Sequence, residues 1–393
     1  MSLAERVKNI TASPTLAISA KAKEMRKRGE EVINFSAGEP DFDTPAFIKQ
    51  AAISAIEEGF TKYTPASGIN ELKEAVIAKF HRDNNLDYSI NQVIVSCGAK
   101  HSLYNCLQAI CNPGDEVIIF SPYWVSYPEM IKLAGARPVV VNTKEEDGFL
   151  PLASSLASAI SQKTKAMIIN SPCNPCGCVY PEKLLREISK FALKNNLLVI
   201  SDEIYEKIIF DSNKHVSIAS LGEDIKNHTL VINGVSKTYA MTGWRIGYSL
   251  ACSEWTRLAG FLQAHSTSNP CSISQWAALA AVEGKATREK EEMHRSFHMR
   301  RDLICELLAG VDGLEFKKPD GAFYVFPRLL TDPQNVNTNR FCSELLFDAG
   351  VAVIPGSAFG AEGYIRISFA ASEDDIRRGI HRLREFLHRR LNT

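Results

Sequence analysis

Several features that would mark a specialised protein are missing from this 393-residue sequence. Its charges balance, with 45 Lys+Arg against 45 Asp+Glu, so nothing marks it as a partner for nucleic acid or an anionic membrane. No apolar stretch is long enough to span a bilayer, and residues 1–10 lack the apolar core of a secretory signal. We therefore expect a cytoplasmic protein that binds neither nucleic acid nor membranes.

Nucleotide-binding motifs are missing as well. No G-x-G-x-x-G turn follows an apolar run, which argues against a dinucleotide site. Residues 234–238 resemble the end of a P-loop, but that motif requires glycine at the positions of Ser236 and Val231.

The ten cysteines, in a chain without a secretory signal, are typical of free thiols. Cys173, Cys176 and Cys178 lie close together in sequence, yet no fourth thiolate or histidine is nearby. Since zinc and iron–sulfur motifs need a fuller ligand set, we expect these thiols to be small buried side chains and predict no metal.

Short apolar runs alternate with longer amphipathic stretches from about residue 93 to residue 251. The runs are residues 93–95, 117–120, 139–141, 166–169, 197–200, 230–232 and 246–248. Continuous apolar runs indicate strands that are buried on both faces, and their alternation with helices is typical of an α/β protein with a mostly parallel sheet.

The pattern changes after Ala251 to a long helical region and then a smaller α+β unit. We expect a large domain at residues 41–285 and a small domain formed by residues 1–40 and 286–393. The composition of residues 295–301 also predicts an exposed helical segment there.

Four polar segments follow predicted strands, and ligands of open α/β sheets bind at such ends. Each contains one residue of chemical interest: Asp202, Lys237, Asn174 or Gly98. Alone, each is also explained as a helix cap, a surface lysine, a turn or a chain reversal. Together they would suit a cofactor with a phosphate, a cationic ring nitrogen and an aldehyde, which describes pyridoxal 5′-phosphate (PLP).

Residues 236–248, SKTYAMTGWRIGY, strongly resemble the lysine-bearing signature of the class I aminotransferases. Further similarity lies at residues 37–42, 62–64, 121–128 and 364–368, so the resemblance covers nearly the whole chain. It is greatest to the aspartate and prephenate aminotransferases. The resemblance implies the type I PLP-transferase fold, with a seven-stranded, mostly parallel sheet beside a smaller domain, and a homodimer with active sites at the subunit interface.

The resemblance also implies roles for the residues around the cofactor ring. Lys237 would form the internal aldimine and shuttle the proton, and Asp202 would pair with the ring nitrogen. Tyr205 and Asn174 would bind the phenolic oxygen of the ring. Trp124 would stack on the ring, with Ile204 against the opposite face.

For the cofactor phosphate, the resemblance implies a set of backbone and side-chain donors. These are the backbone amides of Gly98, Ala99 and Lys100 and the side chains of Ser236 and Arg245, with Tyr63 from the neighbouring subunit.

For the substrate, the resemblance implies that Arg366 binds the α-carboxylate, assisted by Gly38, Asn174 and Trp124. One branch of aspartate aminotransferases uses an arginine from a region matching residues 265–272, where this chain has none. In the branch that this sequence resembles, Lys100 and Thr15 occupy the places that bind the distal carboxylate. Lys100 could instead be a phosphate neighbour or a solvated residue.

The implied reaction is a PLP/PMP ping-pong transfer of the amino group of L-aspartate or glutamate to 2-oxoglutarate or another 2-oxo acid, with prephenate as a further acceptor. Three alternatives share parts of this apparatus. They are a PLP-dependent carbon–sulfur or ACC-type lyase, an aromatic amino acid aminotransferase, and a ligand-sensing module without catalytic activity.

Overall fold

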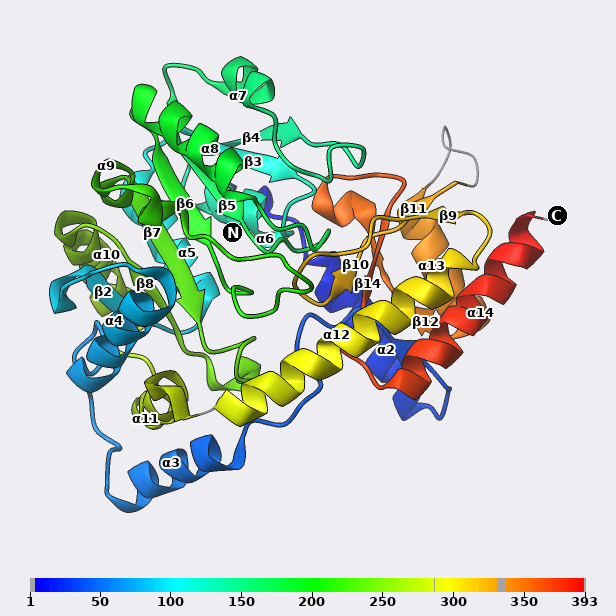
Figure 1. Ribbon diagram of the computed structural model, residues 1–393, viewed down its shortest axis with the longest axis horizontal. Coiled ribbons are helices and arrows are strands. Elements are labelled where there is room, and N and C mark those ends of the chain that lie inside the picture. The colour runs from blue at the N-terminus through cyan, green and yellow to red at the C-terminus, as the bar shows by residue number, and fades with distance from the viewer. Residues whose placement is uncertain (1–3, 286, 331–336, 392–393) are drawn as a thin grey trace.

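The computed structural model describes residues 4–285, 287–330 and 337–391. Its centre is a sheet with the strand order β2-β8-β7-β6-β5-β3-β4 (Figure 1). Listed in that order, the strands are Val93–Ser96, Gly247–Leu250, Thr229–Gly234, Leu198–Asp202, Thr164–Asn170, Glu116–Ser121 and Arg137–Asn142. All seven apolar runs therefore lie in this sheet, and the predicted α/β class is confirmed.

Only β8 runs against its neighbours, pairing antiparallel with both β2 and β7. The remaining pairs of the sheet, from β7 across to β4, are parallel. Because β8 is reversed, its amino end lies at the same edge of the sheet as the carboxyl ends of the other strands.

The helices have the following bounds: α1 Glu5–Lys8, α2 Pro14–Lys27, α3 Ala46–Glu57, α4 Asn70–Asn84, α5 Ala99–Ile110, α6 Ser126–Leu133, α7 Ala153–Ala159, α8 Glu182–Lys194, α9 Glu223–Asn227, α10 Ser253–Ser266, α11 Ser272–Ala280, α12 Thr287–Ala309, α13 Thr338–Ala349 and α14 Glu373–Leu391. None of them is both long and apolar enough to cross a membrane.

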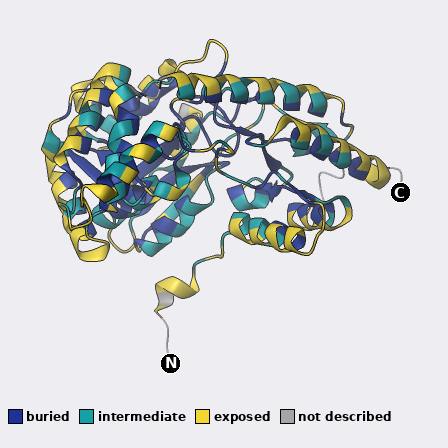
Figure 2. Cartoon of the chain, turned by 90° about the horizontal axis from the view of Figure 1, so that it is seen from below, coloured by how far each residue is buried: buried dark blue, intermediate teal, exposed yellow. Residues whose placement is uncertain are grey.

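Helices cover both faces of the sheet, because alternate strand residues point in opposite directions. Ile119, Ile168 and Ile200 pack in one apolar cluster with residues of α5 and α6. Their neighbours Ile118 and Met167 pack in another, with residues of α8 on the opposite face. The inner strands are accordingly buried, whereas the edge strand β4 is mostly exposed or half-buried, and the helices carry exposed residues on their outer sides (Figure 2).

The smaller part of the molecule contains three short sheets. They pair β1 (Ile33–Asn34) with β12 (Val351–Ala352), join β10 (Tyr324–Val325), β14 (Ile365–Ser368) and β13 (Ile354–Pro355), and pair β11 (Arg328–Leu329) with β9 (Leu314–Glu315). An apolar cluster joins Ile33 and Phe35 to buried residues of α12, α13 and α14. Since residues near position 35 pack with the C-terminal elements, we propose the division at residues 40/41 and 285/286.

The expectation that residues 295–301 are exposed is wrong. Phe297 and Arg301 lie four positions apart, hence on one face of α12, and both are fully buried. Arg301 donates to both carboxylate oxygens of Asp211, at 2.7 and 2.9 Å. This pairing stabilises a guanidinium that composition alone would place in solvent.

Candidate active site

A cavity of about 380 Å³ lies at the edge of the sheet where the strands end. The cavity wall includes Asn174 from the loop after β5, Asp202 at the end of β6 and Lys237 from the loop after β7. Arg245, which lies just before the reversed strand β8, also lines it. The predicted residues on its lining are Thr15, Gly38, Ala99, Lys100, Trp124, Asn174, Asp202, Ile204, Tyr205, Ser236, Lys237, Arg245 and Arg366. One edge of the sheet thus gathers residues that are up to 351 positions apart in the chain.

Two predicted residues do not line this cavity in the single chain. Gly98 lies one position before the lining residue Ala99. The side chain of Tyr63 is directed elsewhere and is 92% exposed. Because Tyr63 is exposed, its side chain is accessible to a neighbouring subunit, as its predicted contact with that subunit's phosphate requires.

Lys237 follows β7, and its Nζ donates to the carbonyl oxygen of Gly38 at 2.5 Å. Burial lowers the pKa of this ammonium to about 8, helped by the charges of Arg245 and Arg366 and opposed by Glu39. A lysine with this pKa has a substantial neutral fraction near neutral pH. Its amine is therefore suited to act as a nucleophile or base.

Asp202 is the last residue of β6 and is buried. Burial raises the pKa of its carboxyl to about 6, although the hydrogen bond from Tyr127 lowers it. Tyr127 donates to Oδ2 at 2.7 Å, and the backbone N–H of Ile204 donates to Oδ1 at 3.3 Å. Within the described ranges Asp202 forms no direct ion pair, although the charge of Lys237 helps to lower its pKa, so its carboxylate is available to pair with a cationic group that enters the cavity.

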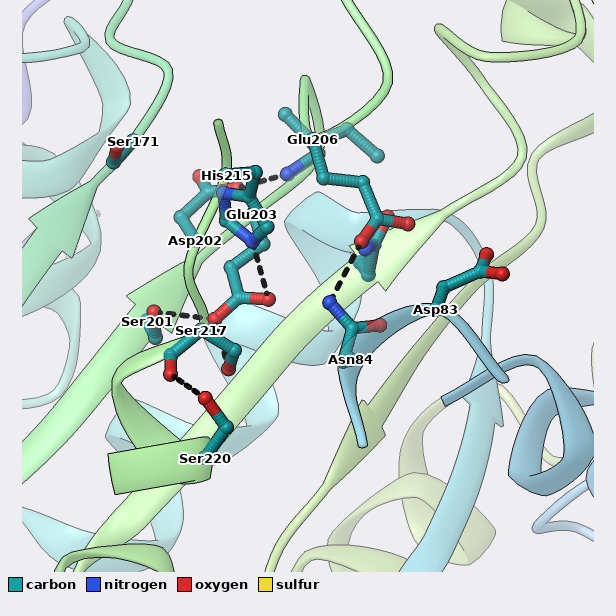
Figure 3. A network of polar contacts seen from close by, with 12 residues as sticks. Asp83, Asn84, Ser171, Ser201, Asp202, Glu203, Glu206, His215, Ser217 and Ser220 are labelled. Carbon is teal, nitrogen blue, oxygen red and sulfur yellow. Dashed lines mark hydrogen bonds and ion pairs between the residues drawn. The ribbon is translucent and has the colours of Figure 1, made fainter. Parts of the chain in front are cut away.

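A second polar network lies directly beside Asp202 in sequence (Figure 3). Oε1 of Glu203 accepts hydrogen bonds from Ser201 Oγ at 2.9 Å and Ser217 Oγ at 2.6 Å, and its Oε2 lies 3.1 Å from Nε2 of His215. Each oxygen of this buried carboxylate therefore has a partner. The negative charge of Glu203 also contributes to raising the pKa of Asp202.

The network continues through Glu206 to helix α4. Glu206 forms an ion pair with Lys79 and accepts a hydrogen bond from Asn84 Nδ2 at 3.3 Å. Burial would raise the pKa of Glu206, but Lys79, with His215 and Lys207, lowers it to about 2. The turn that carries Asp202 and Tyr205 is thus connected to α4 by a buried pair of opposite charges.

Arg366 lies in β14 and is only 2% exposed. Its Nη1 donates to Oδ1 of Asn174 at 3.0 Å, and its Nη2 donates to the carbonyl oxygen of Ser36 at 2.8 Å. The guanidinium carbon stacks 4.4 Å from the centroid of the Tyr324 ring. Its Nε has no partner among the described residues, so the group keeps a free donor beside the cavity.

The start of α5, which follows the turn from β2, contributes to the cavity wall. Because Ala99 and Lys100 are the first two residues of α5, their backbone amides lack acceptors within the helix and could bind an anion. Gly98 has φ = 91°, and a Cβ there would lie 2.5 Å from Nη2 of Arg245. Only glycine lets the turn and this guanidinium approach each other so closely.

Three residues of the site had no role in the sequence-based hypothesis. Tyr127 binds Asp202, the Tyr324 hydroxyl lies 2.8 Å from that of Tyr205, and Asn170 accepts from the backbone N–H of Asn174 at 2.9 Å. The signals for them were that Tyr127 lies in the segment 121–128, which resembles the aminotransferases, and that Asn170 directly follows the apolar run 166–169. Their contacts span as many as 119 positions, which local patterns do not reveal.

Comparison with known proteins agrees with this arrangement. The family model described as "Aminotransferase class I and II" matches residues 30–383. An aspartate aminotransferase of Bacillus sp. (strain YM-2) is 50% identical over 98% of this chain and 99% of its own length. An aspartate/prephenate aminotransferase of Thermus thermophilus is 43% identical over 98% and 99%.

A solved structure shows the same fold. The aspartate aminotransferase from Thermus thermophilus with maleate superposes with a TM-score of 0.94 at 42% identity, covering 98% of this chain and 99% of that one. A family match across most of the chain, together with a cavity that gathers the lysine, the carboxylate and the arginines, establishes that this protein is a member of the class I and II aminotransferases and a PLP-dependent enzyme.

Proposed function

We propose that this enzyme transfers the amino group of L-aspartate or glutamate to 2-oxoglutarate or another 2-oxo acid, with prephenate as a further acceptor. The observation that carries the proposal is that Lys237, Asp202 and Arg366 all face one cavity. The relatives named aspartate or aspartate/prephenate aminotransferase support the choice of a dicarboxylic donor.

The residues of the cavity fit PLP. The cavity volume of about 380 Å³ falls within the roughly 300–1,000 Å³ of small-molecule sites. The α5 amides, Ser236 and Arg245 would hold the phosphate, and Asp202 would face the ring nitrogen. PLP supplies an electron sink for the bond that breaks at the substrate's Cα.

The chain's own residues then provide proton transfer and charge stabilisation. Lys237 would hold the cofactor aldehyde in the resting enzyme and, once free, move a proton to or from the substrate Cα through its neutral amine. Asp202 would keep its negative charge beside a cationic ring nitrogen, which favours electron flow away from that carbon. Tyr205, whose hydroxyl contacts that of Tyr324, would donate a hydrogen bond to the ring oxygen, assisted by Asn174.

Arg366 would orient the substrate by binding its α-carboxylate through two parallel hydrogen bonds. Its contacts to Asn174 and Ser36 support this role, because they hold the guanidinium in one orientation before substrate arrives. Gly38 and Trp124 line the same cavity and would complete this part of the site.

Lys100 and Thr15 would bind the distal carboxylate of a dicarboxylic substrate. Lys100 Nζ lies 4.8 Å from the centroid of the Trp124 ring, and the Thr15 hydroxyl is buried without a hydrogen-bond partner among the described residues. Both residues line the cavity, so each has a donor available for an anion.

The working enzyme is, in this proposal, a homodimer. In a dimer, Tyr63 would reach the phosphate of the neighbouring subunit, which accounts for its 92% exposure in the single chain. Two active sites would then depend on the subunit interface.

The substrate class can be tested by steady-state kinetics. We would compare kcat/KM of wild type and Lys100→Ala for aspartate, glutamate, prephenate and phenylpyruvate. Loss of the distal contact should lower kcat/KM for the dicarboxylic substrates by roughly 10–100-fold and for phenylpyruvate by much less, because a charge-assisted hydrogen bond contributes about 1.5–3 kcal/mol. Equal losses for all four would contradict the role of Lys100.

Incubation with amino donor in the absence of a 2-oxo acid separates the proposal from a lyase. An aminotransferase stops after one half-reaction, whereas a lyase continues to form product. Loss of the visible absorption band in Lys237→Ala provides the control for cofactor attachment. A wild-type protein that binds no PLP would end the proposal.

A further inference from the structure

Cys173, Cys176 and Cys178 bring three sulfur atoms together beside the active site. The three Sγ atoms all lie within 4.8 Å of one another, and those of Cys176 and Cys178 are 3.3 Å apart. All three residues are buried, at 5–6% exposure. The three are buried members of an apolar core cluster, as the sequence predicted, and their proximity also gives them the composition of a soft ligand set.

The backbone of the loop holds the sulfur atoms in place. The N–H of Cys173 donates to the carbonyl oxygen of Cys178 at 3.0 Å, and the N–H of Gly177 donates to that of Cys173 at 2.9 Å. These two backbone hydrogen bonds fix the path of the loop that carries the three thiols.

The thiols have only weak partners outside the group. Cys173 Sγ lies 3.9 Å from the carbonyl oxygen of Pro122, and Cys178 Sγ lies 3.9 Å from that of Phe149. Within the described part of the chain, the group includes no fourth Cys, His, Asp or Glu. A fourth ligand would therefore be a carbonyl oxygen or a water molecule.

We propose that Cys173, Cys176 and Cys178 bind one divalent d¹⁰ metal ion of the zinc type through three thiolates, with an oxygen atom as the fourth ligand. Metal–sulfur bonds of about 2.3 Å in tetrahedral geometry place sulfur atoms roughly 3.8 Å apart, about half an ångström more than the 3.3 Å between Cys176 and Cys178 and within the 4.8 Å that bounds the whole group. On binding, the three thiols release three protons to solvent and no electron is transferred.

Occupancy of this site would also affect the substrate pocket. Asn174 lies within the same loop and accepts the hydrogen bond from Arg366 at 3.0 Å. Coordination must move the sulfur atoms of Cys176 and Cys178 apart, and this shift would weaken the contact between Asn174 and Arg366. The metal should then raise KM for the amino donor.

Cadmium titration of the reduced, PLP-loaded protein tests the site, because thiolate-to-cadmium charge transfer gives an ultraviolet absorption band. The wild type should bind one Cd²⁺ per chain in this loop and show that band. Cys176→Thr and Cys178→Ala should each lose most of it. The PLP absorption band, measured on every variant, shows whether the fold and the cofactor site are retained.

A triple variant, Cys111→Ser/Cys252→Ser/Cys271→Ser, removes the same number of thiols as the proposed ligand set but from other parts of the chain. It should keep the charge-transfer band at wild-type intensity. A wild type without the band, or a Cys176→Thr protein that keeps it, would overturn the metal site.

Kinetics with Zn²⁺ test the effect on the pocket, and this readout alone depends on the proposed transamination. We expect KM for aspartate to rise roughly tenfold in the wild type and not in Cys176→Thr, as for the loss of about one hydrogen bond. A KM unchanged at saturating metal would contradict the coupling to Asn174.

Discussion

The phenolic hydroxyl of Tyr127 donates to Oδ2 of Asp202 at 2.7 Å, although the two residues are 75 positions apart. This hydrogen bond lowers the pKa of a carboxyl that burial raises, so it favours the ionised form that a cationic ring nitrogen needs. Tyr127 is therefore a positioning residue for Asp202.

Tyr127→Phe should weaken PLP binding by roughly tenfold, because the variant loses a hydrogen bond to a charged group. Titration of the apoprotein with PLP, followed by absorbance, gives the affinity. Tyr88→Phe is a matched control, since the Tyr88 hydroxyl is buried without a partner in the described residues. Equal affinities of Tyr127→Phe and wild type would contradict this role.

Asp202→Asn should stabilise the apoprotein in a pH-dependent way. The pKa of Asp202 is raised in the folded state from 3.8 to about 6, so the native state binds a proton that the unfolded state releases between these values. Stability is therefore lost as the pH rises through this window, at a cost of up to ~3 kcal/mol above it.

Urea unfolding of the apoprotein at several pH values measures this effect. The difference between Asp202→Asn and wild type should be small near pH 4 and should grow to its full size above pH 6. Asp312→Asn, at an exposed position, is the control. A difference that does not change with pH would show that the carboxyl titrates as in solution.

The rate at which the apoprotein takes up PLP should rise with pH through about 8. The pKa of Lys237 is lowered to about 8 by burial, and only its neutral amine attacks an aldehyde. Stopped-flow absorbance across the pH range measures the rate. A midpoint near the ordinary lysine value of about 10.4 would contradict the effect of burial.

Gly98→Ala should strongly reduce PLP affinity, because its Cβ would lie 2.5 Å from Nη2 of Arg245 and displace the guanidinium that we propose binds the phosphate. Gly114→Ala provides the control. Its φ of 90° matches the 91° of Gly98, but nothing lies within 4 Å of the added atom.

Both alanine variants should lose about 1–3 kcal/mol of stability through backbone strain. PLP titration should then separate them, with at least a roughly tenfold loss of affinity in Gly98→Ala alone. Similar affinities for the two variants would contradict the contact between Gly98 and Arg245.

The sequence predicted the sheet well because its strands are short, continuous apolar runs. Each run from residue 93 to residue 248 corresponds to one strand, although the reversal of β8 is not visible in its composition. The exposure of Arg301 was predicted wrongly for a related reason. Composition does not show which face of α12 is buried, or that Asp211 pairs with Arg301 on that face.

The candidate site could be predicted where a residue belongs to a motif and not where it acts through a distant contact. Asp202, Lys237 and Arg245 stand in recognisable segments, and the structure brings them to one cavity. The Glu203–His215 contact forms only when the chain returns to the end of β6, so no local spacing predicts it. The catalytic roles of these residues stay predictions until the variants are measured.

Residues 11–16, which comprise the segment before α2 and the first turn of that helix, affect how the enzyme should be produced. Thr11 donates from its backbone N–H and its hydroxyl to Glu129, each at 3.0 Å, while Ser13 and Leu16 form part of the cavity wall. A bulky affinity tag joined ahead of these residues would stand close to where amino acids must enter. Such a tag would alter the kinetic constants measured for the enzyme. A tag placed after α14 is therefore the better choice.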